Sequence, residues 1–349
     1  MEYDTQYHLK KLKTQQRRQT TLTIAIVVVT AAIIGALAAR VTDGSGKFSP
    51  EYDVYVAGHI KNEKDISVAV LWKNGAPTSL SGGTSTAKAN SVFVSGNDVY
   101  VAGYEEIEGT NFPTLWKNGA AHRLGQGSKF DFANYVFVSG EDVYVAGIDK
   151  GVAAFWKNGE SQRLSDLVSE ACSIHVSGND VYVAGYEESA QGITVAVLWK
   201  NGELQRLSAG SKYDSAYSVF ASGSNVYVAG KEVSSNASIA TLWKNGVGTH
   251  LAGAGVTSNA YSVYLSGKDV YVAGTDKGVA ALWKNGASSS VSKASSWAYS
   301  VYVMGNDVYV AGMERNAAKL WRNGASLRLG DESAKSEAKS VFVVRAKSL

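Results

Sequence analysis

Residues 98–103 read DVYVAG, and close copies of this stretch occur at six other places in the 349-residue chain. The first residues of the seven copies, in chain order, are Asp53, Asp98, Asp142, Asp180, Asn225, Asp269 and Asp307. The intervals between them are 45, 44, 38, 45, 44 and 38 residues. Because the intervals themselves recur, residues 53–179 and 180–306 are two copies of a three-unit block, and a seventh unit follows.

Each unit predicts four short strands, which we call A to D. In the second unit, strand A is SVFVS at residues 91–95, a two-residue Gly-Asn turn follows, and DVYVAG is strand B. A variable connection leads to strand C, which ends in Leu-Trp-Lys, and an Asn-Gly turn precedes strand D. Gly-X and Asn-Gly supply the positive φ that two-residue hairpins need. Strand B is apolar on both alternating faces, which predicts a sheet covered on both sides.

Four-stranded antiparallel sheets of about 40–45 residues with two apolar faces are typical of β-propeller blades. The sequence therefore predicts an all-β, seven-bladed β-propeller over residues 53–349. Unit one has no strand A before Asp53, whereas a spare copy, SVFVV at residues 340–344, follows the last unit. We expect this C-terminal strand to complete the first blade and close the ring, because closure removes unpaired edges.

One tryptophan stands near the end of strand C in every unit: Trp72, Trp116, Trp156, Trp199, Trp243, Trp283 and Trp321. We expect these indoles to pack between blades, where burial of so large a side chain contributes favourably to folding. A ring of sugar-stacking tryptophans is the alternative interpretation.

The N-terminal region predicts a membrane anchor. Residues 22–39 are uncharged and apolar, and as a helix they would be about 27 Å long, close to the thickness of a bilayer core. Residues 1–21 are basic, so the positive-inside rule places them in the cytoplasm, and the linker 40–52 leads to an extracytoplasmic propeller. A signal peptide cleaved near Ala38 is the alternative, because Ala36-Leu37-Ala38 resembles an A-x-A site and would give a secreted protein.

Charge and motifs exclude several function classes. The chain carries a net charge of +3, and residues 1–21 alone account for it, so the remainder gives no electrostatic reason to expect nucleic acid as a partner. The single cysteine, Cys172, excludes an internal disulfide. The five histidines share no ligand spacing, and neither H-E-x-x-H nor G-x-S-x-G occurs. We therefore predict a monomeric propeller with no catalytic residue, metal site or cofactor.

Two stretches resemble known extracellular repeats. Residues 69–103, AVLWKNGAPTSLSGGTSTAKANSVFVSGNDVYVAG, are similar to the HAF-type extracellular repeat. Residues 99–114, VYVAGYEEIEGTNFPT, are similar to the seven-bladed propeller repeats called SBBP. Both resemblances imply an extracytoplasmic, mostly bacterial β-propeller without assigned catalytic residues.

Antiparallel strand order assigns the connections to two faces of the predicted disc. The two-residue A–B and C–D turns lie on one face, the tight-turn face, and the B–C and D–A connections lie on the other, the loop face. Because the differences in length between units all fall on the loop face, we expect ligands to bind there. A basic residue precedes every Asn-Gly and is expected on the tight-turn face, as a solubilising group or facing anionic headgroups: Lys73, Lys117, Lys157, Lys200, Lys244, Lys284 and Arg322.

Two sets of loop-face residues are candidate ligand-binding residues. Six units have a carboxylate at the second position after V-A-G, which suits cationic groups or divalent ions: Glu105, Asp149, Glu187, Glu232, Asp276 and Glu314. The D–A connections carry aromatic residues, which suit stacking on sugars or anchoring of a protein partner: Phe130, Phe132, Tyr213 and Trp297. The alternatives are structural: hydrogen bonds at strand ends for the carboxylates, and packing on the adjacent blade for the aromatic residues.

These observations lead to one functional hypothesis and two alternatives. The hypothesis is a membrane-anchored propeller that binds a glycan or protein ligand at the cell surface without catalysis. One alternative is a glycoside hydrolase or lyase that uses loop-face carboxylates. The other is a structural component of a cell-envelope assembly.

Overall fold

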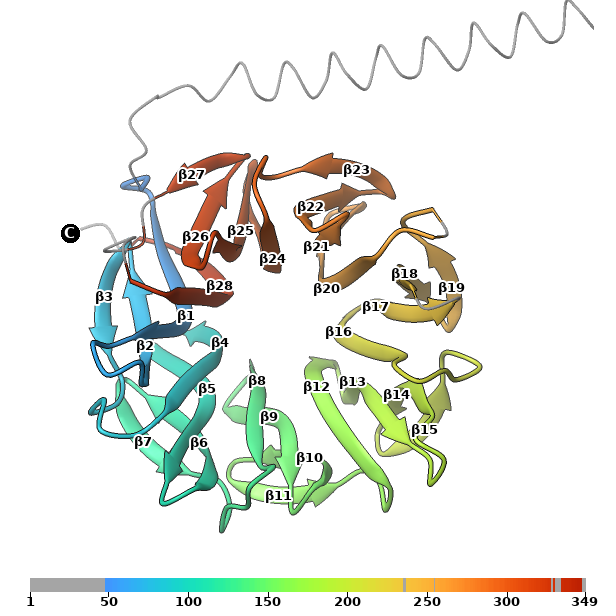
Figure 1. Cartoon of the computed structure of the whole chain (residues 1–349), viewed down its shortest axis with the longest axis horizontal. Coiled ribbons are helices and arrows are strands. Elements are labelled where there is room, and N and C mark those ends of the chain that lie inside the picture. The colour runs from blue at the N-terminus through green and yellow to red at the C-terminus, as the bar shows by residue number, and fades with distance from the viewer. Residues whose placement is uncertain (1–47, 235–236, 254, 328, 330–333, 347–349) are drawn as a thin grey trace, which may run out of the picture. The chain divides into compact units, whose positions relative to one another are not determined.

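Seven four-stranded antiparallel sheets surround a central axis in the computed structural model (Figure 1), which confirms the predicted seven-bladed, all-β propeller. The structure describes residues 48–346 except 235–236, 254, 328 and 330–333. The predicted segments 1–21 and 22–39, and residues 40–47 of the linker, lie outside the described residues. Within the described ranges, no helix is long and apolar enough to cross a bilayer.

Each blade contributes its strand A nearest the axis and its strand D at the rim. Blades 1 and 2 comprise β28 (Ser336–Arg345), β1 (Tyr52–Lys61), β2 (Ser67–Lys73) and β3 (Ala76–Ser79), then β4 (Ala87–Ser95), β5 (Asp98–Ile107), β6 (Thr110–Lys117) and β7 (Ala120–Arg123). Blades 3 and 4 comprise β8 (Phe132–Ser139), β9 (Asp142–Asp149), β10 (Val152–Lys157) and β11 (Glu160–Arg163), then β12 (Val168–Ser177), β13 (Asp180–Glu188), β14 (Thr194–Lys200) and β15 (Glu203–Arg206).

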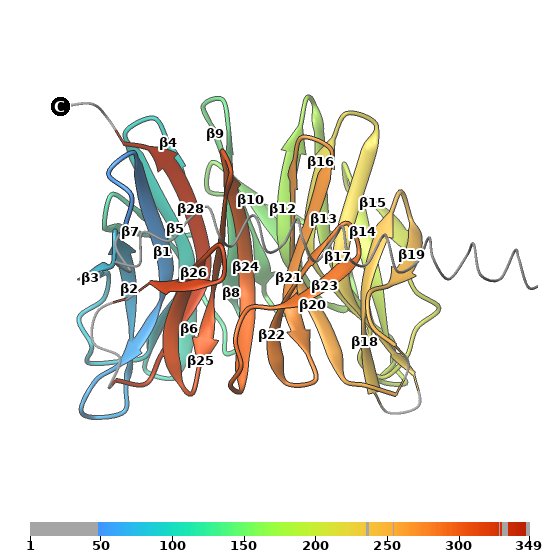
Figure 2. The same cartoon turned by 90° about the horizontal axis from the view of Figure 1, so that it is seen from above.

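The remaining blades repeat this order. Blade 5 comprises β16 (Ser215–Ser222), β17 (Asn225–Ser234), β18 (Ala237–Lys244) and β19 (Val247–His250). Blades 6 and 7 comprise β20 (Ser258–Ser266), β21 (Asp269–Asp276), β22 (Val279–Lys284) and β23 (Ala287–Ser290), then β24 (Ser296–Met304), β25 (Asp307–Glu314), β26 (Ala317–Arg322) and β27 (Ala325–Leu327). In the side view the strands run between the two faces of a disc (Figure 2).

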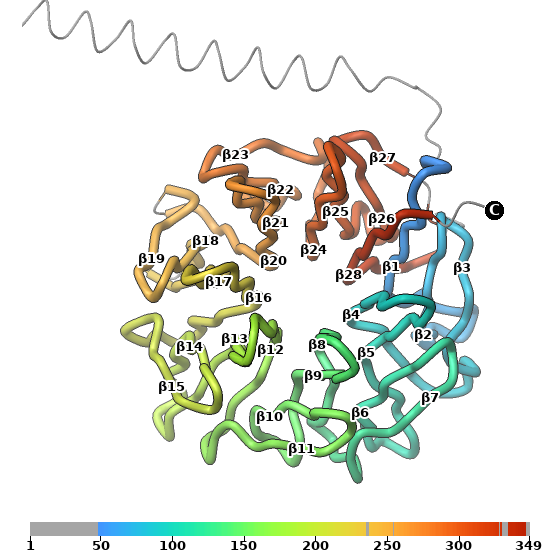
Figure 3. Tube along the Cα trace, turned by 180° about the vertical axis from the view of Figure 1, so that it is seen from behind, coloured from blue at the N-terminus to red at the C-terminus, as the bar shows by residue number. Residues whose placement is uncertain are grey.

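The ring closes as predicted. Strand β28 pairs antiparallel with β1, and the register sets Val341 opposite Val56 and Val343 opposite Val54. The view from behind shows the C-terminal strand lying beside the N-terminal one (Figure 3). Blade 1 is therefore built from both ends of the described chain, and its sheet has the same four strands as the other six.

The strand C tryptophans pack between blades, which confirms the structural interpretation. All seven indole side chains are buried, with at most 3% of each residue exposed. Trp116 of blade 2, for example, lies in one apolar cluster with Tyr55 and Ala57 of blade 1. Six further clusters join the other pairs of neighbouring blades in the same way. The hydrophobic core is thus a set of seven interfaces, each anchored by one tryptophan.

The glycine of V-A-G is required by a close backbone approach. In blade 2 a β-bulge between Ala89 and Ser91 of strand A lies opposite Gly103 of strand B. A Cβ added to Gly103 would lie 2.0 Å from the carbonyl oxygen of Lys88 and 2.9 Å from Trp116 Cζ3. The other six V-A-G glycines approach the equivalent carbonyl oxygen as closely, so a side chain is excluded at this position in every blade.

The tight turns have the predicted geometry. In blade 2, Asn118 and Gly119 both have positive φ, 51° and 84°, whereas in the preceding turn Gly96 has a φ of 60°. Asn118 also ties the turn to strand B: its amide donates to Asp98 over 2.8 Å, and its side-chain oxygen accepts the N–H of Val99. The recurrence of Asp at the start of strand B therefore follows from turn chemistry.

The basic residues of the tight-turn face are neutralised within their own blades. Lys117 Nζ lies 2.9 Å from Asp98 Oδ2, and its ammonium stands 5.3 Å from the centre of the Tyr100 ring. The same ion pair forms in blades 1, 3, 4, 6 and 7. In blade 5 the uncharged Asn225 replaces the aspartate, and the Lys244 ammonium stands 5.3 Å from the centre of the Tyr227 ring. Since these pairs are exposed, each contributes little to stability. The basic residues therefore do not form a ring of uncompensated positive charge.

The B–C connections differ from the expected variable loops. In blades 2, 3, 6 and 7 they are two-residue turns, such as Glu108-Gly109 with φ values of 51° and 77°. The differences in length lie mainly in the strands, since β5 and β6 extend further than β9 and β10. Among the fully described B–C connections, longer ones occur only in blades 1 and 4, at residues 62–66 and 189–193. The number of residues between strands B and C suggested loops, but dipeptides with positive φ close these segments as tight hairpins.

We expect Gly103→Ala to lower the free energy of unfolding by about 3 kcal/mol, because the new methyl group overlaps a backbone carbonyl and a buried indole. Gly82→Ala is the matched control, since a Cβ at Gly82 meets no atom within 4 Å and the change should stay within about 0.5 kcal/mol. Urea unfolding curves measure both. Equal stability of the two variants would contradict the proposed role of the bulge.

Candidate ligand-binding face and axial channel

The predicted acidic residues do not converge on one site. Glu187 accepts a hydrogen bond from Ser165 Oγ at 2.6 Å, and Asp149 accepts one from Ser161 Oγ at 2.6 Å. Glu232 lies within hydrogen-bond distance of Thr241 and His250, and Glu314 accepts a hydrogen bond from Ser292. Glu105 is half-buried. Asp276 Oδ1 is buried without a partner among the described residues. Nowhere in the described chain do three His, Cys, Asp or Glu side chains gather to hold a metal ion.

The four predicted aromatic residues fall into two groups. Phe130 and Tyr213 project into solvent, with 65% and 64% of each residue exposed. Phe132 packs edge-on against Tyr104, with ring centroids 4.9 Å apart, and Trp297 is half-buried on β24 near the axis. The structure therefore brings neither all four aromatic residues nor the six carboxylates into one pocket.

Matching hydrogen-bond clamps hold the two exposed aromatic residues. Ser128 Oγ accepts the N–H of Phe130 and donates to Asp131, which is 1% exposed and also accepts the N–H of Gly151 in the B–C turn of blade 3. In the connection to blade 5, Ser211 accepts the N–H of Tyr213 and donates to the buried Asp214, which accepts the N–H of Val233. Each clamp ties the D–A connection to the blade it enters, so the backbone that carries the aromatic side chain is held in one position.

Exposed aliphatic residues lie between the two clamps. Leu167 and Val168, which enter blade 4, are 47% and 62% exposed, and Ile193 of the blade 4 B–C connection is 42% exposed. Together with Phe130 and Tyr213 they form what we call the apolar arc, which follows the loop face over blades 3 to 5. Exposed apolar side chains gathered on one face of a protein are typical of interaction surfaces.

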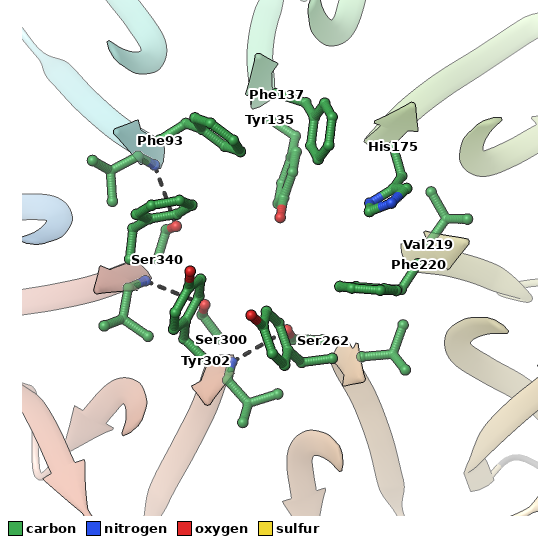
Figure 4. Close-up of a pocket in the computed structure, with 16 residues that line it drawn as sticks. Phe93, Tyr135, Phe137, His175, Val219, Phe220, Ser262, Ser300, Tyr302 and Ser340 are labelled. Atoms are coloured by element: carbon green, nitrogen blue, oxygen red, sulfur yellow. Dashed lines mark hydrogen bonds between the residues drawn. The ribbon is translucent and has the colours of Figure 1, made fainter. Parts of the chain in front are cut away.

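Aromatic side chains surround the axis. Strand A of every blade contributes one ring to the lining of the channel: Phe93, Phe137, His175, Phe220, Tyr264, Tyr302 and Phe342. Figure 4 labels five of these rings around the channel. Neighbouring ring centroids are 4.5–5.2 Å apart, and the Phe342–Phe93 contact of 4.6 Å completes the circle. We call this circle the aromatic collar. Burial lowers the pKa of His175 to about 4, so its ring is neutral near pH 7.

A layer of hydroxyl groups lies next to the collar. Six serines of strand A accept a backbone N–H from the next blade over 3.1–3.3 Å, as Ser340 does from Val92 (Figure 4). Tyr135 occupies the seventh position and points toward the axis. Burial raises the pKa of Tyr135 to about 12. The collar, Tyr135 and three of these serines, Ser262, Ser300 and Ser340, line a cavity of about 200 Å³.

Charged residues gather where the channel opens toward the loop face. We call Lys88, Trp297, Tyr299, Glu337 and Lys339 the mouth cluster; they lie on the neighbouring inner strands β4, β24 and β28. The Lys339 ammonium contacts the carboxylate of Glu337 and stands 3.9 Å from the centre of the Tyr299 ring. Burial opposes ionisation of Glu337, but Lys339 holds its pKa below the usual value. Burial also lowers the pKa of Lys88.

Glu170 stands at the position equivalent to Lys88 on the blade 4 side of the mouth. Its carboxylate accepts hydrogen bonds from Asn134 Nδ2 at 2.9 Å and from the Tyr186 hydroxyl at 3.1 Å. Burial nevertheless raises its pKa, because the donors are neutral. The neighbouring Cys172 thiol has a pKa well above its usual value for the same reason, so it is not a reactive thiolate.

Comparisons with known proteins support the fold. No protein-family model and no curated protein matches the chain. A puromycin-hydrolysing peptidase of Mycobacterium tuberculosis is similar with a TM-score of 0.53 at 12% identity, over 81% of this chain and 52% of that one, so this chain spans about half its length. The β-propeller domain of the Trilobed protease from Pyrococcus furiosus, which has an open velcro topology, is similar with a TM-score of 0.52 at 12% identity. The match covers 81% of this chain and 93% of that one.

Hydrazine synthase of Kuenenia stuttgartiensis gives a TM-score of 0.50 at 10% identity, over 86% of this chain and 47% of that one. Similarities at this level of identity show the propeller fold alone. The resemblance to HAF-type and SBBP repeats stays a prediction.

The collar could have been predicted from the sequence, whereas the mouth cluster could not. Aligning the third residue of each strand A places six aromatic residues and His175 in one column. Lys88 and Glu337 stand at a position that the other blades fill with Phe132, Glu170, Ser215, Asn259 and Trp297, so the repeat does not single them out. Their proximity to Trp297 became visible only when the ring closed.

We expect His175→Phe to reduce the loss of stability in mild acid. The pKa of His175 falls from 6.5 to about 4 on folding, so unfolded chains take up a proton between these values and stability decreases as pH falls from 6.5 toward 4. Replacing the imidazole by a ring that does not titrate should remove about 2 kcal/mol of the loss between pH 7 and pH 5.

Denaturant unfolding at the two pH values measures the effect. His59, whose pKa is likewise lowered to about 4 by burial, retains its own contribution in the variant. His122→Gln, at an exposed position, is the control that should keep the wild-type dependence. An unchanged pH dependence in His175→Phe would show that the imidazole is not held neutral by the collar.

Proposed function

We propose that the chain is a non-catalytic binding propeller whose apolar arc takes a protein ligand. The observation that carries the proposal is the pair of clamps, which present Phe130 and Tyr213 with about two thirds of each residue exposed. Rigid, exposed aromatic residues beside aliphatic ones suit the hot spots of protein interfaces. Leu167, Val168 and Ile193 favour a protein over a glycan, because sugar sites combine aromatic rings with polar groups.

The arrangement of the carboxylates supports binding over hydrolysis. A glycosidase needs two carboxyl groups flanking one bond, whereas these carboxylates mostly accept hydrogen bonds from the blade they belong to or from the segment entering it. We also propose, from the sequence, that residues 22–39 anchor the chain and that the propeller is extracytoplasmic with its loop face turned outward.

Site-specific photocrosslinking tests the binding proposal. A benzophenone amino acid placed at Phe130 or at Tyr213 of the full chain in its native cells should give the same discrete protein adduct. The control position is Val247 at the rim of blade 5, which is 70% exposed and lies outside the arc. Adducts from position 247 equal to those from the arc, or none from the arc, would contradict the proposal.

A glycan array with the full chain distinguishes the second ligand class. We expect that no glycan on the array binds to the apolar arc, because the exposed aliphatic side chains offer no hydrogen bonds to a sugar. A glycan retained by the wild type and lost by the Phe130→Ala, Tyr213→Ala double variant would assign the arc to sugar binding instead.

A further inference from the structure

We propose that the axial channel binds a small organic anion that carries one apolar ring, with the ring in the aromatic collar and the anionic group at Lys88 and Lys339. The channel is separate from the apolar arc in both residues and chemistry, so this site does not depend on the proposed function. Geometry, hydrogen-bonding groups and charge each support the proposal.

The collar is shaped to surround a flat apolar group. Seven rings whose centroids are 4.5–5.2 Å apart form a circle. Its diameter is about 11 Å, and since aromatic carbons approach to about 3.5–4 Å, one six-membered ring fits between opposite members. The cavity of about 200 Å³ exceeds the ~30 Å³ that a water molecule occupies in the liquid, so there is also room for a short side arm.

Hydroxyl groups between the collar and the mouth can donate to a ligand. The oxygens of Ser262, Ser300 and Ser340 already accept a backbone N–H, and no described residue accepts the hydrogen of these hydroxyls. Tyr135 adds a phenol that points toward the axis (Figure 4). The layer therefore favours a ligand that presents acceptor atoms above its ring.

Charge at the mouth favours an anion over a cation. Lys88 is half-buried, and the nearby carboxylate of Glu337 is the main charge that favours its ammonium form, although the two groups form no close ion pair. Lys339 is paired with Glu337, and Lys61 is paired with Asp65. Lys88 and Lys339 therefore share the carboxylate of Glu337, which leaves one positive charge in excess within the mouth cluster. A partly buried ammonium that shares its carboxylate neighbour with a second lysine gains from a further counter-ion, because burial has removed part of its hydration.

Neighbouring titratable groups do not reverse this preference. His59 is neutral near pH 7, since burial lowers its pKa to about 4. Glu170 lies on another blade, its negative charge is matched only by neutral donors, and burial raises its pKa. Within the described part of the cavity lining there is no carboxylate at all. A cationic ligand would therefore meet two lysines and the one carboxylate they share at the entrance, and no counter-charge among the described lining residues inside.

The spacing along β28 sets the length of the ligand. Phe342 lies three residues beyond Lys339 and Phe93 lies five residues beyond Lys88, so the collar and mouth positions are about 10 Å and about 16 Å apart along their strands at ~3.3 Å per residue. A lysine side chain about 6 Å long can shorten either separation. In 3-phenylpropionate the carboxylate oxygens lie about 6 Å from the ring centre, and a charge-assisted hydrogen bond of ~2.8 Å spans most of the remainder. This compound is the probe that the geometry selects.

Calorimetric titration of the full chain with three probes of one shape tests the inference. We expect 3-phenylpropionate to bind about tenfold more tightly than its amide, and 3-phenylpropylammonium not to bind. Equal affinities for the three probes, tighter binding of the ammonium compound, or no heat with any of them would overturn the proposal.

Variants locate the site. Lys88→Met should weaken binding of the acid about tenfold and leave binding of the amide unchanged, while Phe220→Ala should weaken both. Lys244→Met on the tight-turn face is the matched control and should bind like the wild type. Because Glu337 keeps its ion pair with Lys339 when Lys88 is replaced, the variant should fold, and an unfolding curve verifies this. Unchanged affinity of folded Lys88→Met for the acid would place the anion elsewhere and refute the assignment.

Discussion

The pairing of β28 with β1 is the interaction on which the rest of the structure depends. It supplies the inner strand of blade 1, and with it two of the seven interfaces, those that bury Trp72 and Trp116. It also brings Phe342 into the collar and Glu337 and Lys339 to the mouth. A sheet that buries both faces against neighbours exposes an apolar face and a strand edge wherever a neighbour is missing, so closure contributes to stability and to the binding surface together.

Residues that recur and residues that vary have different roles in this propeller. The recurring ones satisfy local constraints that are the same in every blade, such as the close approach at Gly103, the burial of Trp116 and the pairing of Lys117 with Asp98. The varying ones, such as Phe130 and Lys88, lie where a blade meets solvent or the axis. Repetition therefore accounts for the scaffold, and its exceptions carry the candidate binding chemistry.

Much of the fold could be predicted because its determinants are local. Positive-φ dipeptides, two-sided apolar strands and a spare strand at residues 340–344 each act within one unit or at its ends. The steric role of Gly103 was not predictable, because it depends on a bulge in a paired strand. Phe130 and Tyr213 were correctly expected on the loop face, but their clamps involve Gly151 and Val233, about 20 residues away in sequence and on another strand.

The two-ended construction of blade 1 has a consequence for biosynthesis. On the ribosome, β1 is made first and its inner edge has no partner until β28 emerges nearly the whole chain later. During that interval the nascent chain exposes Val54 and Val56, together with a strand edge that another polypeptide can join. Protection of this edge by a chaperone, or late folding of the whole ring, is therefore a requirement for making the protein in soluble form.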